Sequence, residues 1–135
     1  MNRSPSRGFS FIELLITLAI VAILATITVP SFTGLFAKSR RSDAIAALLQ
    51  VQLAQARWRA EQPRYATDLA TLGWRKPASA GGYYRLRIGS ADFDDYLVTA
   101  QPQGGQQNDV CGVFALDGDG PVYRDGYADE GCWRR

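Results

Sequence analysis

Hydrophobic residues are concentrated in one uninterrupted run near the start of the chain, from Phe9 to Val29, which reads FSFIELLITLAIVAILATITV. Glu13 is the only ionisable residue in this run. A helix of this length spans about 30 Å, which matches the hydrocarbon core of a bilayer. A chain of 135 residues has no core wide enough to surround such a helix on every face. The run therefore predicts a membrane-spanning helix over 9–29.

A second helical pattern, this time amphipathic, follows from Pro30 onwards. Its apolar stripe consists of Ala44, Ala47, Leu48, Val51, Ala54 and Trp58, widened by Ile45, Leu49 and Leu53. The opposite, polar face consists of Arg41, Gln50, Arg57 and Glu61. Because Pro63 cannot occupy a helix interior, the pattern predicts a helix over 30–62 that continues the first one and covers an apolar surface.

The remaining residues, 63–135, have the pattern of a loop followed by a sheet. Apolar clusters between glycine-rich turns predict strands over 83–88, 95–100 and 110–116, and a short fourth strand near 121–124 is left open. The loop contains large apolar residues that we expect to pack on the core, namely Tyr65, Leu69, Leu72 and Trp74. Short turns favour antiparallel neighbours, so the expected fold class is α+β, with the long helix packed on a three- to four-stranded antiparallel sheet.

Composition excludes several kinds of chemistry. The chain has no histidine, which rules out Ser-His-Asp and Cys-His catalysis and histidine metal ligands, and its two cysteines cannot form a four-cysteine zinc site. Asp117, Asp119 and Asp125 raise the alternative of a calcium loop. However, Ala128 stands where an EF-hand has its closing glutamate, and Asp-Gly pairs are common in tight turns. We therefore expect no enzyme activity, no metal and no cofactor.

The charges around the hydrophobic run predict its orientation. Arg3 and Arg7 precede the run, so the N-terminus is expected to stay in the cytoplasm and the rest of the chain to lie outside. The residues after Val29 do not resemble a secretory cleavage site. A carboxylate at membrane depth costs about 2 to 3 kcal/mol or more, so Glu13 needs a partner. The candidates are a chain terminus, another subunit, or water at the headgroups.

These residues resemble a known signal. Gly8, Phe9 and Glu13, after a short basic leader and before an apolar run that ends at Pro30, are similar to the class III signal of type IV pilins and of the related type II secretion pseudopilins. The resemblance implies that a prepilin peptidase removes residues 1–8 by cutting between Gly8 and Phe9, and that Phe9 is then N-methylated. It also implies that Glu13 pairs with the N-terminal amine of a neighbouring subunit during assembly.

The resemblance also implies a place and a set of partners. The chain would first lie in the bacterial inner membrane, surrounded by lipid, with its C-terminal part in the periplasm, and would later enter an extracellular pilus. The implied partners are the prepilin peptidase, the inner-membrane assembly platform, the major pilin and other minor pilins. The family's architecture, a long N-terminal helix whose second half packs on an antiparallel sheet, agrees with the fold predicted from the pattern.

The chain departs from the family pattern at two positions. Ser10 stands where the family often has threonine, and Ala22 stands where many pilins have a glycine about eight residues before the proline. In those pilins the helix melts between the glycine and the proline in the filament. Here the β-branched residues 26–29 lead into Pro30 and weaken the helix, so melting is left open.

Cys111 and Cys132 are expected to form a disulfide. They lie in the part of the chain assigned to the oxidising periplasm, and closing this loop would stabilise the fold by about 3 kcal/mol. Paired cysteines bound a C-terminal loop in pilins. The sequence Cys132-Trp133 close to the last residue resembles a group of minor pilins that finish on a Cys-Trp pair.

The small net charge of +2 is the sum of two opposite regions. Residues 38–87 contain ten basic and three acidic residues, a balance of +7, whereas residues 88–135 contain three basic and nine acidic residues, a balance of −6. One interpretation is charge complementarity between neighbouring subunits. The other is DNA binding, because cations alternate with rings that can stack. The candidate DNA contacts are Arg57, Arg59, Arg64, Arg75, Lys76, Arg85 and Arg87.

The leading hypothesis is thus a structural protein, a minor pilin of a type IV pilus that supports pilus biogenesis, twitching, adhesion or DNA uptake. The first alternative is a DNA receptor displayed on the pilus for natural transformation, as some similar minor pilins are. The second alternative is a pseudopilin of type II secretion, which has the same N-terminal signal.

Overall fold

The computed structural model describes residues 8–134, except for the side chains of residues 30 and 31. The predictions made for Arg3, Arg7 and the leader before Gly8, and for the side chain of Pro30, lie outside this description. The chain divides into two compact units, the first ending at Leu35 and the second beginning at Phe36. We call residues 8–35 the N-terminal unit and residues 36–134 the head, and describe each separately.

Helix α1, Phe11–Glu61, runs through both units, so the two predicted helices are one element. The backbone is helical through residues 26–30 and does not melt before the proline in this structure. The hydroxyl of Thr17 donates a hydrogen bond to the carbonyl oxygen of Glu13 at 2.7 Å, and Thr26 donates to Ile23 at 2.7 Å. Such bonds satisfy polar groups of the apolar run within the helix itself.

The large apolar side chains of the N-terminal unit are all exposed. Between Phe9 and Val29 their exposed fractions range from 46% at Leu15 to 85% at Phe9. An 18-residue window of α1 has a mean hydropathy of 2.5, and none of it is buried. By length and composition this is a helix that can cross a membrane, as the pattern predicted, and its apolar surface has no cover within the described residues.

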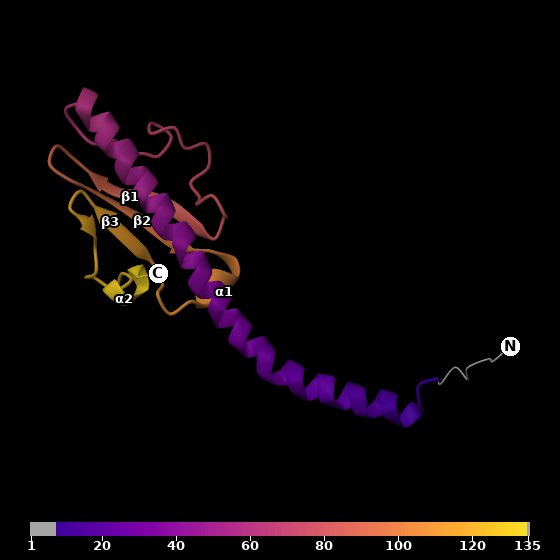
Figure 1. The fold of residues 1–135 in the computed structure, drawn as a ribbon. Coiled ribbons are helices and arrows are strands. Elements are labelled where there is room, and N and C mark those ends of the chain that lie inside the picture. The colour runs from indigo at the N-terminus through magenta and orange to yellow at the C-terminus, as the bar shows by residue number, and fades with distance from the viewer. Residues whose placement is uncertain (1–7, 135) are drawn as a thin grey trace. The chain divides into compact units, whose positions relative to one another are not determined.

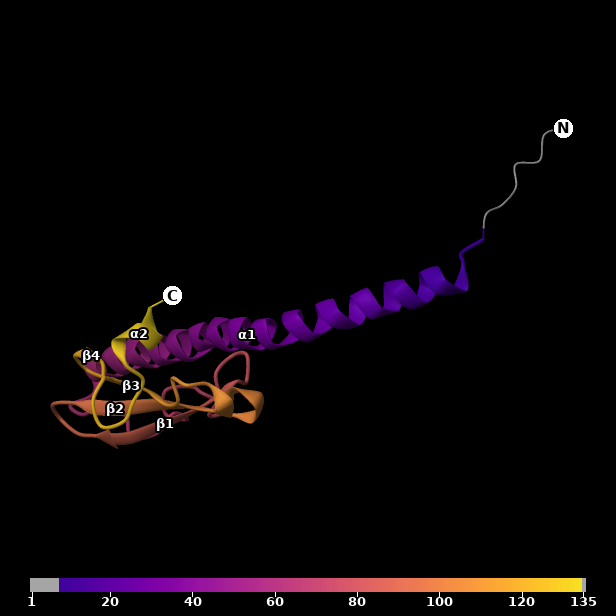
Figure 2. The ribbon, with the colours of Figure 1, turned by 90° about the horizontal axis from the view of Figure 1, so that it is seen from below.

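The head is built on a four-stranded antiparallel sheet with the order β1-β2-β3-β4. The strands are β1 Tyr84–Ala91, β2 Tyr96–Pro102, β3 Phe114–Asp117 and β4 Gly120–Pro121; a 3-10 helix, η1 Gly104–Asn108, follows β2, and a short helix, α2 Glu130–Trp133, follows β4. The second half of α1 lies across one face of this sheet (Figures 1 and 2). The predicted α+β class and the antiparallel order are confirmed.

Two predicted strands are shorter than expected. The third was predicted over 110–116, but β3 begins only at Phe114, because Gly112 has a left-handed backbone (φ 59°) and its N–H donates to the carbonyl of Asp109 in a turn. The open fourth strand near 121–124 is the two-residue β4, which starts one residue earlier. Strands β1 and β2 each begin one residue later than predicted and extend further at the C-terminal end, β1 to Ala91 and β2 to Pro102.

The core of the head forms where the helix stripe meets the sheet. Ala44, Ala47, Leu48 and Val51 are buried as predicted, and so is Ile45. They pack in one cluster with residues of three strands, which include Tyr84, Leu86, Val98, Phe114 and Leu116. In the loop, Leu69 is buried and Tyr65, Leu72 and Trp74 are partly buried against this cluster, which confirms their predicted packing.

The predicted stripe is too wide. Leu49 and Leu53 are 45% and 52% exposed, so they do not belong to the core. Each residue advances about 100° around a helix, which turns Leu49 away from the face that carries Leu48. The sheet covers only the narrower face.

One buried polar residue, Gln55, joins α1 to the loop. Its side-chain amide donates to the carbonyl of Ala66 at 2.8 Å and accepts from the Ala66 N–H at 2.9 Å. The side chain has no exposed surface. Two hydrogen bonds in this reciprocal arrangement satisfy both backbone groups of Ala66 and hold the loop on the helix.

Candidate assembly and nucleic-acid surfaces

The residues of the N-terminal signal lie at the start of α1. Gly8 and Phe9 precede the helix, and Glu13 is in its first turn, where the partial positive charge of the helix N-terminus favours a carboxylate. Glu13 is exposed, and among the described residues its carboxylate has no ion-pair partner. The isolated chain thus leaves this charge available to a group from outside the described residues.

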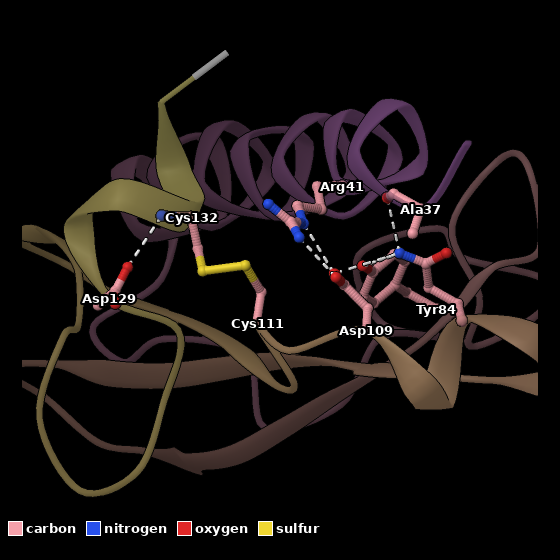
Figure 3. A network of polar contacts seen from close by, with 8 residues as sticks. Ala37, Arg41, Tyr84, Asp109, Cys111, Asp129 and Cys132 are labelled. Carbon is pink, nitrogen blue, oxygen red and sulfur yellow. Dashed lines mark hydrogen bonds and ion pairs between the residues drawn. A yellow bond between two sulfur atoms is a disulfide. The ribbon is translucent and has the colours of Figure 1, made fainter. Parts of the chain in front are cut away.

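Arg41, one of the basic residues of α1, forms an ion pair within the head. The Arg41 guanidinium donates from Nε and Nη2 to the two carboxylate oxygens of Asp109, at 2.8 and 2.6 Å (Figure 3). Their side chains are 19% and 3% exposed. The hydrogen bonds to Asp109 raise the pKa of Arg41. Arg41 was expected on the polar face of the helix, so this expectation is wrong, and Arg41 instead fixes the segment before β3 on α1.

The ion pair belongs to a larger buried network. Gln106 on η1 donates from Nε2 to the carbonyl of Ala37 at 2.9 Å and to the Tyr84 hydroxyl at 3.0 Å. Burial raises the pKa of Tyr84. Next to the network, Cys111 and Cys132 form a disulfide with an S–S distance of 2.00 Å, as predicted. Figure 3 shows Arg41, Asp109 and Tyr84 next to this disulfide. The contacts join α1 to η1, β1 and the segment before β3.

The aspartates considered for calcium are turn residues. The Asp117 carboxylate accepts from the N–H groups of Asp119 and Gly120, and the Asp95 carboxylate accepts from Gly118 at 2.8 Å. Within residues 8–134, no three acidic or cysteine side chains are grouped as metal ligands. The carboxylates instead shape the β1–β2 and β3–β4 turns.

Six of the seven candidate DNA contacts fall into two groups. The first group lies at the end of β1: Arg64 stacks on the ring of Phe93 (3.8 Å to the centroid), and Arg59 lies over the Tyr65 ring (5.7 Å) and donates to the Phe93 carbonyl. Phe93 lies within a turn that also contains Asp92, Asp94 and Asp95. These two arginines are therefore occupied within the molecule, beside carboxylates that repel phosphate.

The second group lies at the start of β1. Arg85 and Arg87 are exposed, because alternate residues of β1 point away from the core. Arg75 and Lys76 are exposed on the loop that precedes the strand. The Leu86 N–H donates to the Pro77 carbonyl at 2.9 Å, which holds this loop against β1. The fold thus brings four cations from the loop and the strand that follows it to one edge, whereas Arg57 is exposed on α1.

Comparison with known proteins identifies the family. The family described as type IV minor pilin ComP, DNA uptake sequence receptor, matches residues 30–115, and the prokaryotic N-terminal methylation motif matches residues 3–29. The chain belongs to the ComP family of type IV minor pilins. The methylation motif covers the positions on which the resemblance rests, so the predicted recognition is confirmed.

Two curated proteins are similar in sequence to this minor pilin. It is 35% identical over 89 residues to the type IV major pilin protein PilA of Myxococcus xanthus, covering 66% of this chain and 40% of PilA. It is 26% identical over 124 residues to the type II secretion system core protein G of Klebsiella pneumoniae, covering 84% of this chain and 86% of that protein. A type IV major pilin and a core protein of a type II secretion system are thus both similar to this chain.

Proposed function

We propose that this minor pilin is a subunit of a type IV pilus, cut between Gly8 and Phe9 and methylated on Phe9. The segment 9–29 holds it in the inner membrane until the assembly platform inserts it among the major pilin and other minor pilins. The observation that carries this proposal is the match of residues 3–29 to the methylation motif on a helix whose apolar side chains are all exposed.

Glu13 has a defined role in this proposal. An ionised carboxylate in an apolar environment is costly unless it is paired, and the described residues offer it no cation. The methylated amine of Phe9 on a neighbouring subunit is a cation that supplies this pairing. Glu13 then selects for subunits that have already been processed, because an uncut neighbour has no amine at Phe9.

Mass spectrometry of the chain purified from the cell envelope tests the processing step. We expect the first residue to be N-methylated Phe9. A Gly8→Glu variant, which changes the residue before the cut and leaves the head untouched, is expected to keep residues 1–8. Wild-type protein that begins at Met1 would overturn the proposal.

A second candidate function, DNA binding, is favoured by the description of the matching family as a DNA uptake sequence receptor. The four cations at the start of β1, which are Arg75, Lys76, Arg85 and Arg87, are exposed, and the bond from the Leu86 N–H to the Pro77 carbonyl holds their two segments side by side. They form the best surface for phosphates on this head. Arg59 and Arg64 contribute less, because they already contact rings and a backbone carbonyl.

Fluorescence anisotropy with a pool of random duplexes, followed by sequencing of the bound fraction, tests this surface. Changing all four cations to glutamine is expected to weaken binding strongly. The slope of log affinity against log salt concentration should become shallower by about 0.9 for each phosphate that the variant no longer neutralises. Arg124→Gln together with Arg134→Gln, at the acidic part of the head, is the control. Unchanged affinity and salt dependence in the fourfold variant would rule this surface out.

A further inference from the structure

The outer edge of β1 is covered over only part of its length. One side of the strand pairs with β2. On the other side, the loop forms a short extra ladder: the Ser79 N–H donates to the Tyr84 carbonyl and the Leu86 N–H donates to the Pro77 carbonyl, both at 2.9 Å. Ala78 forms the antiparallel bridge to Arg85 between them. This cover ends at Leu86.

Proline chemistry explains why the cover ends there. Pro77 has no N–H to return to the Leu86 carbonyl, and the Ala78 N–H donates to the Lys76 carbonyl at 2.8 Å, which makes a tight turn centred on Pro77. The chain before this turn leaves the edge of the strand. If the ladder continued, Arg75 would stand opposite Ile88.

The backbone of Ile88 therefore faces an open edge. In an antiparallel pair alternate residues bond to the partner strand, and the bond from the Gln103 N–H to the Tyr83 carbonyl sets the alternation. Arg85 and Arg87 bond towards β2, whereas Leu86 and Ile88 point outwards. Among the residues that the structure describes, no backbone group pairs with the Ile88 N–H and C=O on this side.

A groove runs along this open edge. Its volume is about 360 Å³. Its lining includes the apolar side chains of Leu69, Trp74, Leu86 and Ile88 and the basic side chains of Arg75 and Arg87. Asp68 is also in the lining, but both of its carboxylate oxygens accept hydrogen bonds from Thr71, which lower its pKa. Among residues 8–134, no hydrogen bond or ion pair engages the Arg75 and Arg87 guanidinium groups, so the groove combines an apolar floor, two available cations and unpaired strand groups.

We propose that this groove binds an extended polypeptide segment of a partner protein, which adds a short strand to β1 and carries acidic side chains next to an apolar one. The segment would pair with the Ile88 N–H and C=O, place an apolar side chain beside Trp74, and direct carboxylates towards Arg75 and Arg87. The bulge between Ile88 and Ser90 ends the regular edge, so the added strand is short.

The edge favours a polypeptide over DNA. A phosphate in the groove would accept from the Ile88 N–H but would also face the carbonyl oxygens of Leu86 and Ile88, which repel it. A strand offers both donors and acceptors and satisfies all three groups. The DNA contacts proposed above use side chains that are exposed outside this groove as well, so a change in the uncharged backbone edge separates the two proposals.

Amide exchange measured by NMR tests the site directly. The probe is a nine-residue peptide of alternating valine and aspartate with blocked ends, added to the ¹⁵N-labelled full chain in detergent micelles. We expect the Ile88 amide to shift and to become protected from exchange. The same peptide with lysine in place of aspartate is expected to leave it unchanged. An Ile88 amide that neither shifts nor becomes protected at millimolar Val-Asp peptide would overturn the proposal.

A backbone variant separates this site from the DNA surface. Ile88→Pro removes one outward N–H and no charge, at an edge position where proline is tolerated, whereas Ile88→Thr keeps the N–H. We expect Ile88→Pro to weaken peptide binding about five- to tenfold relative to Ile88→Thr, as the loss of one hydrogen bond predicts, with unchanged DNA affinity. Loss of DNA affinity with unchanged peptide binding would show that the edge contacts DNA and would refute the proposal.

A side-chain variant tests the site independently of whether the Ile88→Pro variant folds. Arg75→Gln leaves the backbone of β1 intact and lies on the exposed loop. It is expected to weaken binding of the Val-Asp peptide several-fold, without a change in the urea midpoint of the head. Equal binding by wild type and Arg75→Gln would contradict the assigned role of this cation.

Discussion

Leu24 and Leu48 belong to the same helix, but Leu24 in the N-terminal unit is 59% exposed, whereas Leu48 in the head has no exposed surface. Both residues are equally apolar. The sheet and the loop of the head cover Leu48, whereas no described residue covers Leu24, whose cover in the proposed function is lipid and then other subunits. One continuous helix therefore lies in two environments. Among the described residues, the chain itself supplies the apolar cover of the helix in the head but not in the N-terminal unit.

Removing the charge of Glu13 is expected to have the largest effect, because it changes where the N-terminal unit finds its cover. Glu13→Ala should abolish incorporation into pili, because the pairing that draws the N-terminal unit out of lipid is lost, while membrane insertion stays intact or improves. Immunodetection in sheared pili and in membranes measures both. Glu61→Ala, which removes an exposed carboxylate of the head, is the matched control. Normal incorporation of Glu13→Ala would refute the pairing role.

The same substitution in the two units tests the comparison itself. Leu48→Ala removes a fully buried side chain and is expected to lower the free energy of unfolding of the head by about 2–5 kcal/mol. Leu24→Ala should leave it unchanged. Urea titration followed by tryptophan fluorescence measures only the head, because Trp58, Trp74 and Trp133 all lie there. Equal midpoints for the two variants would show that the head does not have a core of its own.

The disulfide gives the head a stabilisation that the N-terminal unit lacks. Replacing Cys111 and Cys132 by serine is expected to cost about 3 kcal/mol, because the unfolded chain regains the freedom of the closed loop. The urea midpoint of the head should fall, with the helicity of the micelle-bound N-terminal unit unchanged. Wild type in reducing agent is the control and should behave like the double variant. An unchanged midpoint in both would contradict a stabilising role.

The smallest expected effect is the loss of stability that accompanies ionisation of one buried tyrosine at high pH. Burial raises the pKa of Tyr96 to about 12, compared with about 10 for an exposed tyrosine. The folded state then holds this proton more tightly than the unfolded state, so the stabilisation is complete below pH 10 and is lost as the pH rises towards 12. Phenolate absorbance follows the ionisation, and the chain's tyrosines all lie in the head.

Tyr96→Phe is the control for this titration and should remove the ionisation near pH 12. Because the N-terminal unit has no tyrosine, lipid or detergent around it should not alter the curve. A folded wild-type head whose phenols all ionise near pH 10 would contradict the burial of Tyr96.

Periodicity was sufficient to predict the helices, the antiparallel sheet and the core positions around Leu48, because these depend on local spacing. It could not reveal the Arg41–Asp109 pair, since 68 positions separate the two residues and each is ordinary in its own segment. It placed a strand over 110–113 because Val110 and Val113 are apolar, whereas the backbone of Gly112 and the turn from Asp109 prevent one. All seven candidate cations could be named from the sequence, but the division of six of them into two groups required the fold.

Gln55 is expected to tolerate fewer substitutions than the apolar residues that precede it on α1. Val51 and Leu48 can exchange for residues of similar volume at modest cost. At position 55 leucine would leave both backbone groups of Ala66 buried without partners, glutamate would lack the donor, and asparagine would be one methylene too short. A saturation library at these positions should therefore retain many residue types at 48 and 51 but almost only glutamine at 55, so a polar residue is the least replaceable part of this apolar core.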